Sequence, residues 1–588
     1  MAKPKKTPES SDTSPADVIP QATTSKLRKL IIQNFGCIGV FPVEVELDEV
    51  VVLVGPNNVG KSTILRAYQA ITESSVPKLT LDDFHECEVD PNALPTIELV
   101  TAVGDDLPGS RWVQKIDGEN IVRECWVWKE VEVPAKRQGW DVTIPGWSDN
   151  VPWGAPNVAN SRRPIPHRLE AFANPAEQIK KVTTMLLDVL QERIKGRPVE
   201  TIGEDGKQQR TAYGKLLDAL ADTQKTVVEE AKAEIEATEA QLTSFVGAVF
   251  KGYEIKFDAR PEDDLAKGLN FFKAGTELQM GPKDGHLSNA ERQGSGARRT
   301  LMWAALRFIS ESTKKGDAGP SHLLLLDEPE LCLHPNAIRE ACATLYQLPE
   351  TKKWQVMVTT HSPAFIDLSR DNTTVVRVER DLTGVVRGTT VFRPARVKLD
   401  DGEKGELKLL NIYDPHVAEF FFGGRTVLVE GDTEYTAFKY VMAEDAEREL
   451  FKDVHIVRAR GKVTIALLAK ILNQFGARYA VLHDSDLPTT AGGVWTNNTR
   501  ILTEVAKTLD PSRVRLVASV TNFESAMFSA EANKEKPYNA YRTLKAEPAA
   551  YGRVKELLLA LVDFSKPLPA SCVQWSDLSQ LEAAIPKP

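Results

Sequence analysis

The apolar run Val50-Val51-Val52-Leu53-Val54 leads directly into Gly55-Pro56-Asn57-Asn58-Val59-Gly60-Lys61-Ser62. This stretch fits the pattern GxxxxGK followed by Ser or Thr, between a predicted buried strand and a helix starting near Lys61, and it indicates a nucleotide-binding α/β fold. Backbone N–H groups of such a phosphate-binding loop (P-loop) and of the helix N-terminus bind phosphate oxygens. We expect Lys61 to reach the β- and γ-phosphates of a nucleotide and Ser62 to ligate Mg²⁺. The loop residues predicted to bind the nucleotide are Gly55, Asn57, Asn58, Gly60, Lys61, Ser62 and Thr63.

Two further apolar runs end in polar residues suited to the same site. Leu323-Leu324-Leu325-Leu326 ends in Asp327-Glu328, and Val356-Met357-Val358-Thr359-Thr360 ends in His361. Because phosphoryl transfer depends mainly on positioning and charge, we expect Asp327 to hold Mg²⁺ and Glu328 to polarise the attacking water. We expect His361 to contact the γ-phosphate; the alternative for a lone histidine is a structural role.

Three short segments resemble the ABC-ATPase superfamily. They are most similar to its branch with SMC, RecF-like and OLD (overcoming lysogenisation defect) proteins. Ile32-Gln33-Asn34-Phe35 is similar to a motif of that branch, residues 293–299 resemble its signature loop, and residues 328–335 resemble its D-loop segment. The resemblance implies that ATP is the nucleotide and that Ser295 and Gly296 contact ATP bound by a second ATPase head. The chain has one P-loop, so this arrangement requires a homodimer or a higher homo-oligomer. Residues 293–296 lack the L-S-G-G form of transporters, which leaves open whether the ATP sandwich closes in the usual way.

The C-terminal part of the chain carries two groups of acids, each directly after a predicted buried strand. Thr426-Val427-Leu428-Val429 precedes Glu430-Gly431-Asp432-Thr433-Glu434, and Tyr479-Ala480-Val481-Leu482-His483 precedes Asp484-Ser485-Asp486. Parallel strands present such carboxylates together at the C-terminal edge of their sheet. Clustered carboxylates repel one another unless a cation joins them, and oxygen ligands suit Mg²⁺ or Mn²⁺. Two such ions stabilise the attacking and leaving oxygens at a phosphodiester.

This ordered pair of motifs resembles the Toprim domain of topoisomerases, primases and OLD (overcoming lysogenisation defect) nucleases. Further matches are Gly461-Lys462 after the predicted strand Val454–Arg458, Asn522-Phe523-Glu524, and Lys536-Pro537. The resemblance implies that Lys536 stabilises charge on the phosphate, with Lys534 as the competing candidate. It implies a set of metal ligands: Glu430, Glu434, Asp484, Asp486 and Glu524, beside Ser62 and Asp327 at the nucleotide. The predicted catalytic residues are Glu430, Asp484, Asp486, Lys536, Glu328 and His361.

The predicted fold class is α/β: an ABC/SMC-like ATPase domain with an inserted helical dimerisation arm, followed by a C-terminal, Rossmann-like Toprim domain. We expect a disordered tail at 1–24, the ATPase at 25–395 with the helical insert at about 168–255, a linker at 396–420 and the Toprim domain at 421–588. Helical periodicity from 175 to 250 indicates two helices separated by a break at 203–206. Periodicity alone leaves a dimer interface and simple core packing equally open. The segment 134–166 is expected to be a loop anchored by Trp140, Trp147 and Trp153, with stacking of bases on these rings as the alternative.

Composition sets further bounds on the protein. The 588 residues carry a net charge of −9, so nucleic acid would be bound through local patches or bound metal. No apolar run is long enough to span a bilayer, and the six cysteines lack metal-ligand spacing. We therefore expect a cytoplasmic protein with reduced thiols and no membrane association.

Three functions fit these motifs. The first is an ATP-regulated, divalent-metal-dependent DNA endonuclease; the second is a DNA-binding repair or recombination ATPase whose Toprim fold is structural; the third is a Toprim RNase. The OLD resemblance implies DNA as the partner and bacterial defence against phages, in some members with a helicase or retron partner. Whether ATP activates or inhibits cutting stays open.

Overall fold

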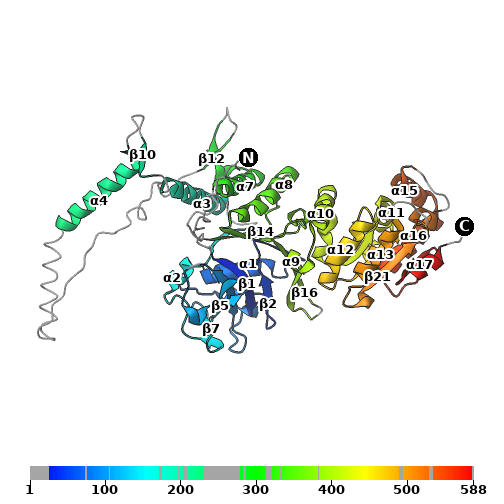
Figure 1. The fold of residues 1–588 in the computed structure, drawn as a ribbon, viewed down its shortest axis with the longest axis horizontal. Coiled ribbons are helices and arrows are strands. Elements are labelled where there is room, and N and C mark those ends of the chain that lie inside the picture. Colours follow the sequence, from blue (N-terminus) through cyan, green and yellow to red (C-terminus); the bar gives the residue numbers. More distant parts are fainter. Residues whose placement is uncertain are drawn as a thin grey trace, which may run out of the picture. The chain divides into compact units, whose positions relative to one another are not determined.

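A computed structural model of the chain describes residues 25–72, 74, 76–104, 106–170, 175–195, 198–202, 208–230, 278–281, 286–312, 321–331, 333–381, 383–488, 494–528 and 534–585. The predicted tail at 1–24, the break at 203–206 and the arm beyond 230 lie outside these residues. The chain divides into two compact units, one formed by Met1–Phe172 with Lys314–Pro588, the other by Ala173–Thr313 (Figure 1).

A mainly parallel sheet carries the P-loop strand at its centre. β3 is buried along its whole length, in keeping with its run of valines and a leucine. The edge strand β17 alone runs antiparallel to its neighbour. The strand order is β17 (Val386–Phe392), β16 (Thr373–Arg380), β3 (Val50–Val54), β15 (Trp354–Thr359), β14 (His322–Asp327) and β9 (Ile165–Leu169).

A second sheet, coloured blue to cyan in Figure 1, is antiparallel, and its strands lie before and after β3 in the chain. Its strands are β2 (Val43–Glu46), β1 (Lys26–Gln33), β4 (Thr96–Val103), β6 (Glu119–Val127), β7 (Lys136–Asp141) and β8 (Gly146–Ser148), with β5 (Gln114–Ile116) pairing β6. The expectation of a plain loop at 134–166 was wrong, because this segment forms the β7–β8 hairpin, helix α2 (Pro156–Ser161) and strand β9. Trp140 and Trp147 pair edge-to-face across the hairpin, and the Arg123 guanidinium lies 4.4 Å from the Trp140 ring centre.

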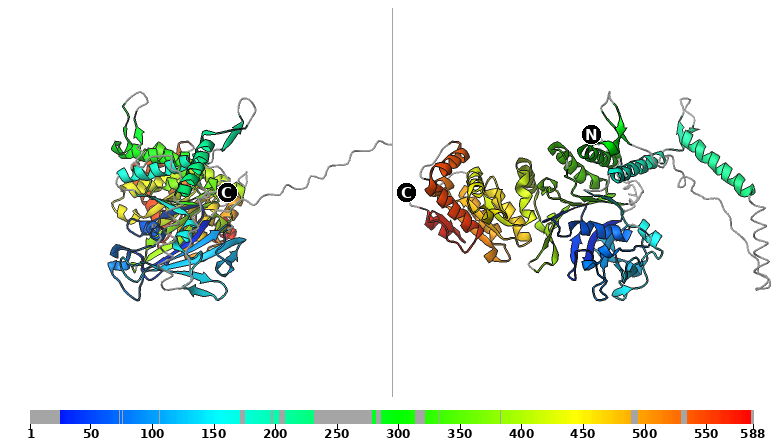
Figure 2. Two further views of the ribbon diagram at one scale, coloured as in Figure 1. Left: turned by 90° about the vertical axis from the view of Figure 1, so that its left-hand side faces the viewer. Right: turned by 180° about the vertical axis from the view of Figure 1, so that it is seen from behind.

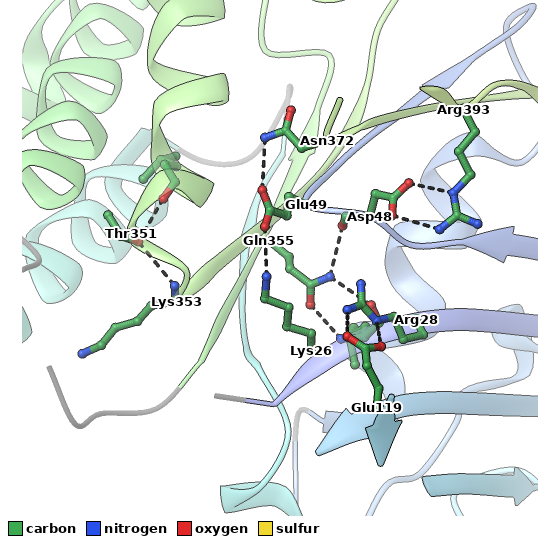
Figure 3. A network of polar contacts seen from close by, with 12 residues as sticks. Lys26, Arg28, Asp48, Glu49, Glu119, Thr351, Lys353, Gln355, Asn372 and Arg393 are labelled. Atoms are coloured by element: carbon green, nitrogen blue, oxygen red, sulfur yellow. Dashed lines mark hydrogen bonds and ion pairs between the residues drawn. The ribbon is translucent and has the colours of Figure 1, made fainter. Parts of the chain in front are cut away.

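The two sheets share one apolar core and a buried polar network. Helix α1 (Lys61–Thr72) contributes Ile64, Leu65 and Tyr68 to this core. Figure 3 shows the buried Gln355 of β15 reaching β1: its amide oxygen accepts from the Leu27 N–H at 2.7 Å, and its amide nitrogen donates to the Leu27 carbonyl at 3.0 Å. These paired bonds link the P-loop sheet to the antiparallel sheet beside their shared apolar core.

A five-stranded sheet forms the C-terminal domain, with helices packed around it (Figure 2). Its strand order is β19 (Val454–Arg458), β18 (Arg425–Val429), β20 (Tyr479–Asp484), β21 (Val514–Ser519) and β22 (Cys572–Gln574), of which β22 alone is antiparallel. Alternate residues of β18, Val427 and Val429, enter a core shared with four helices: α11 (Asp432–Glu444), α14 (Phe523–Met527), α15 (Lys536–Ala546) and α16 (Pro548–Val562). Helix α12 (Lys462–Gln474) contacts β18 and β20 and packs against α13 (Val494–Val505).

The charged stretch predicted as a linker is largely helical. It contains α10 (Asp401–Tyr413), followed by the 3₁₀ helix η7 (Pro415–Phe422). Asp400 caps α10 by accepting from the Glu403 N–H, and the Glu403 carboxylate accepts from the Asp400 N–H in return. Leu407 and Leu410 supply the buried face that irregular chain would lack. The ATPase and Toprim boundaries at 395 and 421 stay predictions.

The remaining elements of the first unit are short or lie outside the sites. The helices are α8 (Pro335–Gln347), α9 (Pro394–Val397) and α17 (Leu578–Ala584). The 3₁₀ helices are η1 (Leu81–Asp83), η2 (His85–Cys87), η3 (Ser110–Trp112), η5 (Leu348–Thr351), η6 (Pro363–Phe365), η8 (Arg448–Phe451) and η9 (Pro511–Arg513).

The second unit contains the predicted helices of the insert. Ile179, Val182 and Met185 lie buried along one face of α3, as their spacing indicates. The described elements are α3 (Pro175–Lys195), β10 (Glu200–Ile202), β11 (Gln208–Arg210), α4 (Ala212–Glu230), β12 (Gln279–Met280), β13 (Ser288–Asn289), η4 (Ala290–Arg292) and α7 (Ser295–Ser312). The dimerisation role of this arm stays a prediction. Among the described helices of the chain, none has the length and apolar character needed to cross a membrane.

Candidate functional site

The P-loop places a buried lysine at the start of α1. Lys61 is only 5% exposed, and its ammonium donates to the carbonyls of Gly55 at 3.0 Å and Pro56 at 2.7 Å. Burial lowers the pKa of Lys61, and Glu328, Asp327 and Glu330 oppose this shift. Both acceptors of these hydrogen bonds are neutral backbone carbonyls. The positive charge of Lys61 is therefore available to an anion such as a phosphate.

The glycine that opens the P-loop is required by its backbone and its surroundings. Gly55 has φ +134°, and a Cβ there would lie 2.0 Å from the carbonyl oxygen of Val378 on β16. Asn58 takes the left-handed conformation with φ 58°, which asparagine tolerates better than most residues. Asn57 and Asn58 are exposed at the loop tip, while Thr63 lies 3.4 Å from the Cys37 thiol.

The strand-end residues predicted for the nucleotide site meet beside the P-loop. The Ser62 hydroxyl donates to Asp327 Oδ1 at 2.9 Å. His361 Nε2 lies 3.1 Å from the Lys61 ammonium and 3.3 Å from Glu328 Oε1. β14 and β15 are parallel neighbours, so their C-terminal ends bring these side chains together.

Two residues of this site were missed from the sequence. The Thr359 hydroxyl donates to Asp327 Oδ1 at 2.6 Å, and Thr359 Oγ1 also accepts from the Glu328 N–H at 3.0 Å. Glu330 Oε1 accepts from the His361 N–H at 2.7 Å. Glu328 itself has φ 44°, a strained conformation that these bonds stabilise. The hydroxyl pair directly before His361 was the only sequence signal for Thr359.

Ser295 and Gly296 are the first two residues of α7, in the second unit. The side-chain amide of Gln293, just before them, donates to the Met280 carbonyl at 2.9 Å and to the Ser288 hydroxyl at 2.7 Å. These bonds hold the signature-like segment against the β12–β13 hairpin. Its contact with ATP on a second chain stays a prediction.

Five acids form the second site, at the C-terminal edge of the five-stranded sheet. They are called the acid cluster below and are Glu430, Glu434, Asp484, Asp486 and Glu524. Glu430 follows β18 and Asp484 ends the adjacent strand β20, and the Asp484 N–H donates to Glu430 Oε2 at 3.0 Å. Glu434 lies in the first turn of α11 and Glu524 in that of α14, both buried. The acids come together because the ends of strands β18 and β20 and the starts of helices α11 and α14 lie on one edge of the sheet.

Burial and mutual repulsion raise the pKa values within the acid cluster. Burial raises the pKa of Asp484 well above its usual range, and Glu434, Glu430 and Glu524 add to the rise. Burial together with Glu430 and Glu524 raises the pKa of Glu434 to about 7. Burial also raises the pKa of Glu430, while the Lys462 ammonium opposes that rise. Such a cluster is costly as free carboxylates and is relieved by a bound cation.

The donor set of the acid cluster fits a hard divalent cation. Asp484 Oδ1 is buried and has no hydrogen-bond partner, so one strong acceptor is unused. Carboxylate oxygens are the ligands that Mg²⁺ and Mn²⁺ prefer. In the part of the chain that the structure describes, no three His, Cys, Asp or Glu side chains form a ready-made ligand set, so the acids must adjust when a cation binds.

One predicted lysine reaches the acid cluster. Lys536, the first residue of α15, lies 3.3 Å from Glu524 Oε1, and the Thr433 hydroxyl donates to the same oxygen at 3.2 Å. The Lys536 side chain is 48% exposed, which leaves its ammonium accessible to a substrate phosphate. Among the described residues it is Lys536, not Lys534, that pairs with Glu524.

A second lysine in the acid cluster was missed. Lys462 is buried, forms an ion pair with Asp486 and donates to the side-chain oxygen of Asn498 at 2.8 Å. The sequence pointed only to the glycine turn at Gly461, because a single lysine after a glycine carries no recognisable signal. Asn498 lies 36 residues along the chain from Lys462 and has no motif of its own.

A buried histidine supports the strand that carries Asp484. The Trp575 indole N–H donates to His483 Nε2 at 3.2 Å, so His483 Nδ1 carries the proton and donates to the Asp484 carbonyl at 2.7 Å. Burial lowers the pKa of His483 to about 3, so the ring is neutral at neutral pH.

Comparison with known proteins adds to this geometry. The family model of an AAA ATPase domain matches residues 26–102 and 172–366, and the model of an "Overcoming lysogenization defect protein-like, TOPRIM domain" matches residues 421–486. The chain is 24% identical over 473 residues to the OLD nuclease of Thermus scotoductus, covering 78% of this chain and 82% of that protein. It is 23% identical over 511 residues to the Old nuclease of Escherichia phage P2, covering 80% of each.

Among solved structures, the chain is similar to an Smc head bound to the C-winged helix domain of ScpA. The identity is 15% and the TM-score 0.34, over 63% of this chain and 99% of that one. The two family models place an ATPase domain before a Toprim domain, in the order that the sequence motifs indicate. The chain therefore has an AAA ATPase domain followed by an OLD-like Toprim domain, and it is similar to two OLD nucleases over about four fifths of its length.

Proposed function

We propose that this protein is a divalent-metal-dependent DNA endonuclease whose ATPase domain regulates cutting. The observation that carries the proposal is the acid cluster, in which Glu434, Glu430 and Glu524 help to raise the pKa of Asp484, whose buried Oδ1 has no hydrogen-bond partner. A purely structural Toprim fold would have no need for acids that raise one another's pKa. The two relatives named as nucleases, each matched over about four fifths of the chain, support the same activity.

In this proposal the acid cluster holds Mg²⁺ or Mn²⁺. The bound cation supplies charge stabilisation at the phosphodiester and a water of lowered pKa. Glu430 and Asp484 are held in register by the bond between Asp484 N–H and Glu430 Oε2. Lys536 offers an accessible ammonium to a phosphate oxygen, where its charge offsets the negative charge that develops during cleavage.

The nucleotide site supplies the regulatory half of the proposal. Lys61 and the P-loop amides bind the phosphates of ATP, and Ser62 and Asp327 are the candidate Mg²⁺ ligands. Glu328 orients the attacking water, while His361 contacts the γ-phosphate. Two copies of the chain would complete the sandwich through Ser295 and Gly296, so a homodimer or larger homo-oligomer is part of the proposal. A cytoplasmic location and a role in defence against phages, with or without a helicase or retron partner, belong to it as well.

The test uses purified full-length protein with supercoiled plasmid, linear DNA and total RNA, each with Mg²⁺ or Mn²⁺ and with or without ATP. We expect metal-dependent nicking or cleavage of DNA, changed by ATP, and lost in the Asp484→Asn and Glu430→Gln variants. Matched controls are Lys61→Met, which should keep metal binding at the acid cluster, and thermal unfolding of every variant. Cleavage of RNA but not of DNA would assign RNA as the substrate. No cleavage of any substrate, or cleavage that persists in both acid variants, would contradict the proposal.

A further inference from the structure

Helix α15, labelled in Figure 1, begins beside the acid cluster. Its first residue, Lys536, lies 3.3 Å from Glu524 Oε1, so the start of the helix adjoins the acids. Ala540 and Leu544 are buried in the core of the C-terminal domain and attach the helix to it. The helix therefore leads away from the acids with one side held by the core and another side open to solvent.

The open side of α15 combines aromatic and basic side chains. It consists of Tyr538, Tyr541, Arg542 and Lys545 and is called the α15 face below. Their spacings of three and four residues place these side chains on one face of the helix. Tyr538, Arg542 and Lys545 are exposed, and Tyr541 is half-buried. An aromatic ring beside two cations is the combination with which proteins bind single-stranded nucleic acid.

The Tyr538 ring is held in place by its neighbours while much of it stays accessible. It lies nearly parallel to the Tyr541 ring, with an interplanar angle of 28° and ring centres 6.4 Å apart. Tyr541 in turn meets Tyr440 of α11 edge-to-face at 5.3 Å, and the Arg542 guanidinium lies 6.0 Å from the Tyr538 ring centre. Tyr538 is nevertheless 57% exposed, so its apolar ring is positioned but not covered. A planar base could stack on it with little further ordering of the side chain.

The charge of the α15 face is not compensated locally. Helix α15 contains Lys536, Arg542 and Lys545 but no acid, although the whole chain has 82 acids against 73 Lys and Arg. Among the described residues, no carboxylate lies within ion-pair distance of Arg542 or Lys545. The acids Glu535 and Glu547 directly flank the helix at its two ends. In an acidic protein, such a local run of unpaired cations is complementary to phosphate groups.

We propose that the α15 face binds a single-stranded stretch of the DNA substrate, with one unpaired base stacked on Tyr538 and phosphates beside Arg542 and Lys545. The inference rests on the proposed DNA cleavage and deepens it, because it names the form of DNA that reaches the acid cluster. The bases of a duplex are paired and stacked on one another, so a duplex offers Tyr538 no free base face. From Lys545 to Lys536 the helix rises about 14 Å, so a strand bound along it leads to the acids over a few nucleotides.

The test compares two DNA forms by fluorescence anisotropy with the full-length, nucleotide-free protein. The probes are a labelled oligothymidylate and a labelled duplex of equal length, in EDTA so that no metal-dependent cleavage occurs. Tyr538→Ala should weaken binding of the oligothymidylate by about tenfold and binding of the duplex by less than about twofold. Tyr538→Phe keeps the ring and should keep the wild-type affinity for both probes.

The cations are tested by the salt dependence of the same binding. Arg542→Gln and Lys545→Gln should weaken both probes and lower the slope of log affinity against log salt for the single strand by about 0.7 each. The matched control is Lys452→Gln, whose side chain is 74% exposed just before β19, at the opposite edge of the sheet. This control should change neither affinity nor slope, and thermal unfolding of every variant shows that the fold is kept.

The outcomes separate this inference from the proposed function when plasmid cleavage with Mn²⁺ is measured on the same preparations. Cleavage by the wild type, together with unchanged oligothymidylate binding in Tyr538→Ala, overturns the inference alone. An equal loss for oligothymidylate and duplex in Tyr538→Ala also overturns it, because stacking of an unpaired base requires a difference. Selective loss of the single strand in a protein that cleaves nothing contradicts the proposed function and supports the α15 face as a binding surface for single strands.

Discussion

The nucleotide site and the acid cluster use the same local arrangement for opposite purposes. In each, a buried parallel strand is followed by a positive-φ glycine and a lysine that opens a helix: Gly60 and Lys61 before α1, Gly461 and Lys462 before α12. Both lysines are buried, with exposures of 5% and 4%. What differs is the group that each ammonium meets.

Lys61 donates to two backbone carbonyls, which are neutral, whereas Lys462 is paired with the carboxylate of Asp486. A charge bonded to neutral acceptors remains able to attract an anion, while a charge already paired inside the protein does not. One lysine is therefore available for phosphate, and the other balances the protein's own negative charge. A glycine and a lysine at a helix start therefore do not by themselves identify a phosphate site.

The largest expected effect separates the chemistry of the two sites. Asp484→Asn should lower DNA cleavage by about a thousandfold or more, equivalent to about 4 kcal/mol, because it removes a central acid of the cluster. ATP hydrolysis should stay close to the wild-type rate. Cleavage and ATP turnover are measured on the same preparation. If both fall together, the two sites are not separable in the way that their geometry indicates.

The reciprocal change acts on the nucleotide site. Glu328→Gln should lower ATP hydrolysis by about a hundredfold, because the amide cannot accept a proton from the attacking water. Nucleotide affinity should change little, since Lys61 and the P-loop amides remain. Steady-state hydrolysis and equilibrium binding of ATP distinguish the two effects. Weakened binding with unchanged turnover would assign Glu328 to phosphate binding instead.

A smaller effect concerns a histidine pair at the other end of the ATPase sheet. His167 Nε2 lies 3.0 Å from His322 Nδ1, and His322 stacks on Trp354 with ring centres 4.6 Å apart. Burial lowers the pKa of His167 to about 4 and that of His322 to about 3. Below the ordinary histidine pKa of about 6.5, only the unfolded chain gains these protons, so each histidine costs about 1.4 kcal/mol of stability per pH unit.

This loss begins as the pH falls below about 6.5 and continues toward the folded pKa values, whereas above pH 6.5 both states are neutral. We expect His322→Gln to make the unfolding free energy less dependent on pH between 6.5 and 4. Denaturant titrations at a series of pH values measure the slope for both proteins. Equal slopes would show that His322 is protonated in the folded protein as readily as in the unfolded chain.

The smallest expected effect compares the two glycines that precede the lysines. Gly60 and Gly461 have φ of +102° and +133°, so alanine is strained at both. A Cβ at Gly60 would also lie 2.7 Å from the Cys37 thiol, while a Cβ at Gly461 would meet nothing within 4 Å. Gly60→Ala should therefore destabilise the protein by about 1 kcal/mol more than Gly461→Ala. Thermal unfolding measures the difference, and Cys37→Ala in the Gly60→Ala background should recover part of it.

Much of the fold and part of both sites followed from local patterns. The P-loop, Asp327 and His361 at the ends of β14 and β15, and the acids at the ends of β18 and β20 lie where the motifs indicated, because strand-end residues of a parallel sheet share one edge. The segment 134–166 was misjudged, since its strands are stabilised by the pairing of Trp140 with Trp147 and of β9 with β14. The helix α10 was not predicted, because the charges of residues 396–420 hid its buried face; the role of this segment as a linker stays a prediction.

The sequence by itself determined the order of the two domains and the identity of the motif residues, because those motifs depend on short spacings along one strand and turn. Only the tertiary structure decided which charge meets which partner. Thr359 joins Asp327 across two strands, and Lys462 meets Asp486 and Asn498 from separate elements. Electrostatic interactions act through space and depend on burial, so residues far apart in the chain determine whether a lysine binds a phosphate or neutralises an acid.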